Sequence, residues 1–94
     1  MKSFMLRLAS PKGYAFTGEC VMLRLRGIDG DLAILAGHIP FVTAITAGEC
    51  RIEMEDGSEK RFSTEGGLLS VCATGATVLA GQIRELSDAS ESHA

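Results

Sequence analysis

The sequence predicts an all-β domain, and three observations carry this prediction. Apolar and polar residues alternate with a period of two in several short runs, which is typical of strands with one buried and one exposed face. Eleven glycines, many of them in turn-forming pairs, separate these runs. Before residue 80, no apolar pattern with helical spacing persists for three turns. Many short strands joined by tight turns indicate a β-sandwich or barrel.

The first two predicted strands occupy residues 4–8 and 21–26. In each run every second residue is apolar, so one face is buried. Arg24 and Arg26 fall on the opposite, exposed face of the second strand. The turn-forming sequence that ends at Gly13 closes the first strand.

The next two predicted strands form a hairpin. Residues 50–55 alternate, and Asp56-Gly57 separates them from residues 58–63. An Asp-Gly pair between two strand-like runs is a strong hairpin signal, because its glycine readily adopts positive φ.

A second hairpin is expected from residues 68–73 and 76–80, around Thr74-Gly75. Beyond it, residues 83–89 form the one candidate helix, which is short and weakly amphipathic.

Length and charge restrict the function classes. The 94 residues fit one domain, which we place at 1–85, followed by a polar tail, 86–94, expected to be disordered.

A net charge of −3 gives no cationic surplus for nucleic acid. No apolar run reaches the roughly 18 residues of a membrane helix, so no direct membrane insertion is expected. The amino terminus lacks the apolar core of a signal peptide, so we do not expect export.

The three cysteines, Cys20, Cys50 and Cys72, are widely spaced and form no C-x-x-C pair. An odd, dispersed count disfavours a disulfide framework and fits a reducing compartment. The paired short spacings of a zinc site are also absent. We therefore expect free core thiols, with Cys50 and Cys72 on apolar strand faces, and no metal.

No cluster in the sequence indicates catalysis. His38 lies in a turn between apolar runs, without a recognisable nucleophile or orienting partner, and is interpreted as a structural or interface residue. Asp29 and Asp31 flank Gly30, but the further carboxylates of a calcium loop are missing. We interpret them as turn residues and expect no catalytic residue and no cofactor.

Residues 27–45 are more specific than their composition. They read Gly-Ile-Asp-Gly-Asp-Leu-Ala-Ile-Leu-Ala-Gly-His-Ile-Pro-Phe-Val-Thr-Ala-Ile. This segment resembles the signature of the epsilon subunit of rotary proton-translocating ATP synthases, and its Gly-His-x-Pro element is the most specific part. Gly66–Val71, Thr77–Ala80 and Phe16–Glu19 resemble further motifs of that family. All occur in the family order, so the resemblance covers about residues 3–85.

The resemblance implies a ten-stranded flattened β-sandwich and a non-catalytic rotor subunit in the central stalk. Such a subunit joins the gamma subunit to the membrane c-ring and couples ion translocation to ATP synthesis. It would lie peripherally at the cytoplasmic face of the bacterial inner membrane, or at the equivalent place in an organelle. The family usually carries a carboxy-terminal helical hairpin that inhibits ATP hydrolysis and in some members binds ATP, and this chain would lack both activities.

The resemblance also assigns two interfaces by position. The expected c-ring contact consists of Ile28, Asp29, Gly30 and Asp31. The expected gamma contact consists of His38, Ile39, Phe41, Val42 and Thr43. The chain departs from the family pattern at Ala33, Ala36, Phe41, Glu65 and Gly81, which is consistent with a divergent member.

Two other hypotheses compete with this one. An unrelated β-sandwich that binds a peptide or a small ligand would need a deep pocket lined by aromatic residues, and the chain has only five aromatic residues with which to build one. A small enzyme would need one cysteine activated beside His38.

Overall fold

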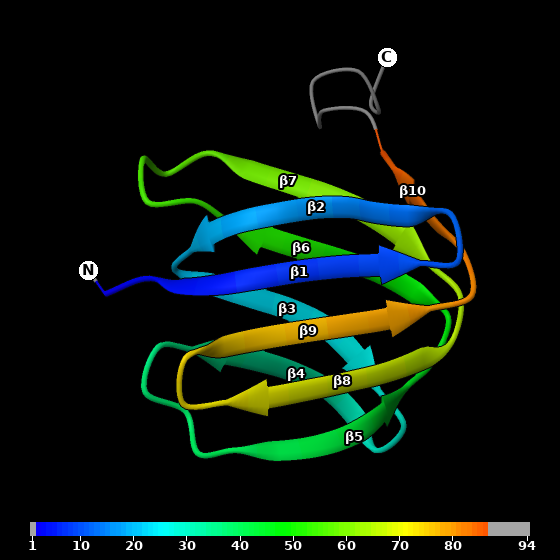
Figure 1. The fold of residues 1–94 in the computed structure, drawn as a ribbon, viewed down its shortest axis with the longest axis horizontal. Coiled ribbons are helices and arrows are strands. Elements are labelled where there is room, and N and C mark those ends of the chain that lie inside the picture. The colour runs from blue at the N-terminus through cyan, green and yellow to red at the C-terminus, as the bar shows by residue number, and fades with distance from the viewer. Residues whose placement is uncertain (1, 87–94) are drawn as a thin grey trace.

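The computed structural model of the protein describes residues 2–86, and this part of the chain is all-β with no helix (Figure 1). Its ten strands are β1 (Phe4–Ser10), β2 (Gly13–Cys20), β3 (Met22–Gly27), β4 (Gly30–Leu35), β5 (Phe41–Ile45), β6 (Gly48–Glu53), β7 (Glu59–Thr64), β8 (Gly67–Cys72), β9 (Gly75–Ala80) and β10 (Ile83–Glu85). The predicted tail, residues 86–94, lies outside the described residues except for its first residue.

The strands form two layers. One has the order β5-β8-β9-β1-β2, and the other has the order β10-β7-β6-β3, with β4 on the free side of β3. Figure 1 shows β2, β1, β9 and β8 in front of β6, β3 and β4. The layers join where Gly27 of β3 pairs with Ile45 of β5. The result is a flattened, nearly closed β-sandwich, which confirms the predicted fold class.

Both predicted hairpins are confirmed. Strands β6 and β7 pair around the Asp56-Gly57 turn, where Gly57 has a φ of 91° and the Ser58 amide donates to Asp56 Oδ1 at 2.9 Å. Strands β8 and β9 pair as far as Cys72 opposite Gly75.

The predicted helix over residues 83–89 is wrong where the structure describes it. Residues 83–85 form β10, which pairs antiparallel with β7, and the Leu86 amide continues the ladder by donating to the Arg61 carbonyl at 2.8 Å. A short isolated helix is marginal, whereas the free edge of β7 offers backbone partners to any neighbouring segment. Residues 87–89 lie outside the described residues.

The core lies between the layers and is built by alternation. The largest fully buried side chains are Phe62, Leu6, Leu8, Leu23, Ile34, Ile52, Leu69 and Val78. They come from seven strands and both layers. Phe16 of β2 meets Phe62 of β7 edge to face, with ring centroids 6.2 Å apart. Burying each large apolar side chain contributes roughly 1.5–3 kcal/mol, so this interior is the main stabilising element.

The cysteines divide into two kinds. Cys20 and Cys50 are fully buried in the core, as predicted, and burial raises their pKa to about 11 and about 12. The prediction that Cys72 lies on an apolar face is wrong, because alternation along β8 turns Leu69 and Val71 inward and leaves Cys72 exposed. The Thr74 hydroxyl, 3.3 Å from the Cys72 sulfur, lowers the pKa of that thiol.

We expect Cys72 to react with iodoacetamide at least roughly a hundredfold faster than Cys20 near neutral pH. The thiolate is the nucleophile, and raising the pKa of Cys20 from its ordinary value of 9.0 to about 11 lowers its thiolate fraction a hundredfold. Mass spectrometry of timed samples measures this, and Cys72→Ser removes the fast site. Labelling of all three thiols at similar rates would contradict the assignment.

One glycine marks a close approach of two strands. A Cβ atom on Gly67 would lie 1.9 Å from the Leu79 carbonyl oxygen and 2.8 Å from the Ala80 Cα. These are backbone atoms of β9, the neighbouring strand, so they cannot rotate away. At Gly81, by contrast, nothing lies within 4 Å of the corresponding position.

Gly67→Ala should therefore lower the free energy of unfolding by roughly 2–3 kcal/mol, since the two strands must separate to admit the methyl group. Gly81→Ala is the matched control and should stay within roughly 0.5 kcal/mol of the parent. Urea denaturation followed by circular dichroism measures both variants. Equal stabilities would show that the β8–β9 contact tolerates a side chain.

Candidate functional site

The described residues do not build a catalytic centre around His38. Its Nδ1 lies 3.0 Å from the Ile39 carbonyl, so that nitrogen donates locally, and its ring packs on Phe41 with centroids 5.0 Å apart. His38 and Cys72 line one hollow of about 10 Å³, which holds at most a single water molecule. A substrate does not fit there. Among residues 2–86, no group of three or more His, Cys, Asp or Glu side chains is placed to hold a metal.

No helix that could cross a membrane occurs among residues 2–86.

The four residues expected to contact the c-ring meet at one hairpin tip. Gly27 pairs with Gly30, so Ile28 and Asp29 form the two-residue loop between β3 and β4. Gly30 has a φ of 132°, a conformation that favours glycine. The Ile28 side chain is 64% exposed, while its amide donates to the Ala44 carbonyl at 3.1 Å. The tip therefore projects an apolar side chain from a backbone that is held in place.

Asp31, at the base of this tip, has a partner in its own chain. Its Oδ1 lies 3.5 Å from the Arg26 Nε, and both side chains are well exposed. The two residues face each other across the β3–β4 ladder. An exposed pair of this kind contributes little to stability, about 0–1 kcal/mol, so its carboxylate remains available to another cation.

The five residues expected to contact gamma do not form a single surface. Ile39 and Val42 are 74% and 65% exposed. Phe41 packs against the core, and Thr43 is half-buried opposite the fully buried Leu69. Consecutive strand residues point to opposite faces, so a contiguous run such as 41–43 is necessarily divided between interior and exterior.

The two expected interfaces lie at opposite ends of β5. The hairpin tip attaches near Ile45, where Gly27 pairs with it, and the His38 loop precedes Phe41 at the other end. Five strand residues span roughly 13 Å between their first and last Cα atoms. Figure 1 shows the β3–β4 turn and the β4–β5 loop on opposite sides of the molecule.

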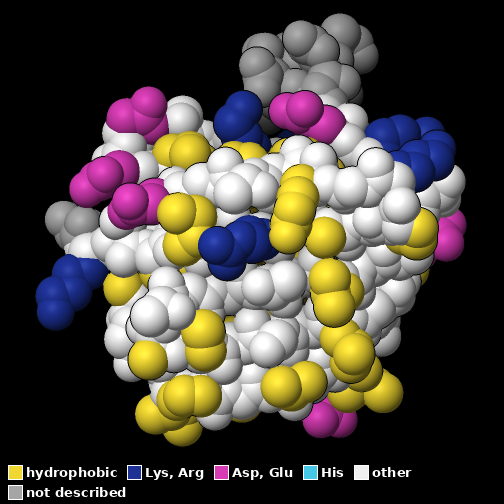
Figure 2. All heavy atoms as spheres, viewed as in Figure 1, with side chains coloured by type: hydrophobic (Ala, Val, Ile, Leu, Met, Phe, Trp, Pro, Cys, Tyr) yellow, Lys and Arg dark blue, Asp and Glu magenta, His cyan; other side chains and the backbone are white. Residues whose placement is uncertain are grey.

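A further surface escaped the sequence analysis. The outer face of the β5-β8-β9-β1-β2 layer carries an apolar row that follows the strand register. Successive partners across the five strands are Ala44, Leu68, Leu79, Ala9 and Tyr14. Figure 2 shows hydrophobic side chains spread over this face and acidic ones near its rim.

The large members of the apolar row are open to solvent. Leu68, Leu79 and Tyr14 are 49%, 51% and 69% exposed. Val42, two residues before Ala44 on β5, shares the same outer face. Exposed apolar side chains in register are typical of surfaces at which proteins associate. The doublets Leu68-Leu69 and Val78-Leu79 were the available signal, because they place apolar residues on both faces of a strand.

Comparison with known proteins identifies the family of this β-sandwich. Residues 3–85 match the family described as the ATP synthase delta/epsilon chain β-sandwich domain. The fold resembles a chain of the Euglena gracilis mitochondrial ATP synthase OSCP/F1/c-ring structure, with a TM-score of 0.83 and 19% identity over 88% of this chain. It also resembles a chain of the Tetrahymena thermophila mitochondrial ATP synthase central stalk and c-ring structure, with a TM-score of 0.70 and 14% identity over 99% of this chain.

The chain spans 53% of the Euglena chain and 72% of the Tetrahymena chain. The family match extends over all ten strands. The protein therefore belongs to the ATP synthase delta/epsilon chain family, through its β-sandwich domain.

Proposed function

We propose that the protein is a non-catalytic central-stalk subunit of an ATP synthase that holds the gamma subunit on one surface and the c-ring on another. It thereby couples ion translocation to ATP synthesis. The observation that carries this proposal is the presence of two exposed surfaces of different chemistry: the acidic hairpin tip between β3 and β4, and the apolar row across the β5-β8-β9-β1-β2 layer. In this role the domain, residues 1–85, sits peripherally at the cytoplasmic face of a bacterial inner membrane or its organelle equivalent.

The gamma subunit docks on the apolar row together with Ile39 and Val42. Removing exposed apolar surface from water drives protein association, and buried apolar anchors carry most of the energy of an interface. Leu68 and Leu79 are directly opposite each other on neighbouring strands, so they present one continuous patch to the partner.

The c-ring docks on the hairpin tip. Ile28 supplies an apolar contact, and Asp29 and Asp31 supply negative charge to the polar loops of the ring. The tip is tied to β5 through the Ile28 amide and the Thr46 amide, which donates to the Arg26 carbonyl at 3.1 Å. A load applied at the tip therefore passes directly into the strand that leads toward the gamma surface.

Leu79→Asp should weaken binding to gamma at least roughly tenfold, since it introduces a charge that the interface would have to desolvate. Ala47→Asp adds the same charge at an exposed turn outside the apolar row and should bind like the parent. Calorimetric titration against purified gamma measures both. Equal weakening by the two variants would show that the added charge lowers the affinity for gamma wherever it is placed, and that the apolar row is not the binding surface.

Asp31→Arg should weaken attachment to the c-ring more than it weakens folding, because the exposed Asp31–Arg26 pair stabilises the domain by at most about 1 kcal/mol. Pull-down of detergent-solubilised ring and the melting temperature are measured together. Glu55→Arg, at the exposed end of the β6–β7 hairpin, is the matched control. Parallel loss of stability and of ring binding would contradict an interface role.

The proposal as a whole is tested by reconstitution. An ATP synthase depleted of this subunit should regain ATP-driven proton pumping when the chain is added, and the chain should co-purify with gamma. Pumping that is fully restored without it, or failure to bind gamma, would overturn the proposal.

A further inference from the structure

The outer face of the opposite layer carries a cleft of about 450 Å³. Arg24 of β3 faces Arg51 of β6, and Arg51 faces Arg61 of β7. Arg26 lies two residues after Arg24 and so points to the same side. We call this the arginine cleft, formed by Arg24, Arg26 and Arg51, with Leu32 and Ala33 among its lining residues.

Three arginines in direct register are unusual in a chain of net charge −3. Like charges opposite one another on neighbouring strands are destabilising. Local rules of this kind are typically violated at functional sites. The repulsion among these three arginines is therefore a reason to look for an anionic partner that offsets it.

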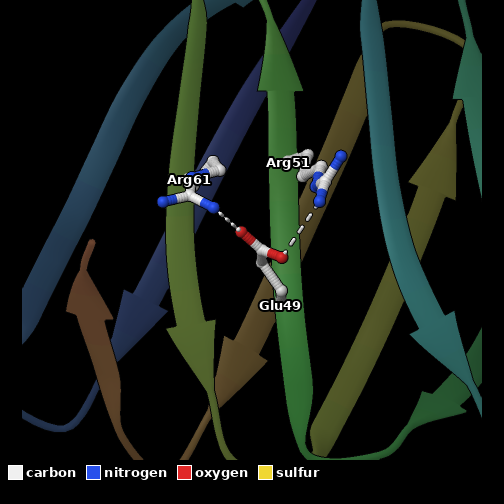
Figure 3. A network of polar contacts seen from close by, with 3 residues as sticks. All are labelled: Glu49, Arg51 and Arg61. Atoms are coloured by element: carbon white, nitrogen blue, oxygen red, sulfur yellow. Dashed lines mark hydrogen bonds and ion pairs between the residues drawn. The ribbon is translucent and has the colours of Figure 1, made fainter. Parts of the chain in front are cut away.

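Two carboxylates neutralise part of the charge. Glu49 lies between Arg61 and Arg51, with ion-pair distances of 2.9 and 3.4 Å, as Figure 3 shows. Asp31 pairs with Arg26. Arg24 stands between these pairs, and its Nε donates to the neutral sulfur of Met22 at 3.2 Å.

The resulting charge and shape select one ligand chemistry. Three guanidinium groups and two carboxylates line the cleft, which leaves a net charge of +1. A phosphate monoester carries about −1.5 to −2 near neutral pH and offers three acceptor oxygens, which planar guanidinium groups bind in a bidentate manner. The volume lies in the range of small-molecule sites, about 300–1,000 Å³, and exceeds what a bare phosphate needs.

We propose that the arginine cleft binds a small phosphate monoester. Arg24 and Arg51 hold the phosphoryl group, and Ala33, which lies opposite Arg24 on the neighbouring strand, contacts the organic part. The site lies on the layer opposite the apolar row, so binding does not depend on the function proposed above. Arg26 also pairs with Asp31 at the hairpin tip, so a bound phosphoryl group competes with Asp31 for that guanidinium.

Ribose 5-phosphate is a suitable probe, with ribose as the uncharged control. We expect saturable amide shifts of β3, β4 and β6 in a nuclear magnetic resonance titration of the chain, absent with ribose. Arg24→Gln should weaken binding roughly tenfold, the loss of about one charge-assisted hydrogen bond. Arg24 is exposed, so the fold should survive, and the melting temperature checks this. Arg7→Gln, an exposed arginine on the other layer, should bind like the parent.

Vesicles distinguish the source of the phosphoryl group. Flotation with phosphatidic acid but not phosphatidylcholine, lost in Arg24→Gln, would assign the ligand to a lipid headgroup. Binding of ribose 5-phosphate without flotation would assign it to a soluble molecule. No saturable shifts and no flotation would overturn the proposal, as would equal affinity of the parent and Arg24→Gln.

Discussion

The pairing of Gly27 with Ile45 is the contact on which the architecture depends. It is the one register pair between β3 and β5, and it makes a single sheet of the two layers. The flanking hydrogen bonds, from the Ile28 amide to Ala44 and from the Thr46 amide to Arg26, extend this junction on both sides. The two layers turn one face of each strand toward the core, so each layer has one outer face that is open to solvent. One face carries the apolar row and the other carries the arginine cleft.

Much of the fold can be predicted from the sequence because its strands and turns are determined by residues that are close together in the chain. A period of two and an Asp-Gly turn determine a hairpin within residues 48–64, and β6–β7 forms as expected. The β10 strand was missed because three residues carry almost no pattern, and their conformation comes from the edge of β7, far away in the chain. Cys72 was misplaced because the doublets Leu68-Leu69 and Val71-Cys72 put apolar residues on both faces of β8, so the sequence does not show which face is buried.

The site is less predictable than the fold because surfaces are made by register between strands. The hairpin tip was predictable as a unit, since Ile28 and Asp31 are neighbours in the sequence. The run from Phe41 to Thr43 was not, because alternation turns its members to opposite faces. The apolar row and the arginine cleft each combine several strands. Only the three-dimensional pairing of Leu68 with Leu79, and of Arg24 with Arg51, reveals them.

The parallel pairing of β1 with β9 has a consequence for how the chain matures. Met5 lies beside Gly75, and Leu8 beside Val78, so the first strand finds its central place only after a segment about seventy residues later has been synthesised. Domains dominated by such non-local pairs fold slowly, in milliseconds to seconds. A nascent chain on the ribosome pairs β1 with β2 early, but the other edge of β1 has no partner until β9 has been synthesised.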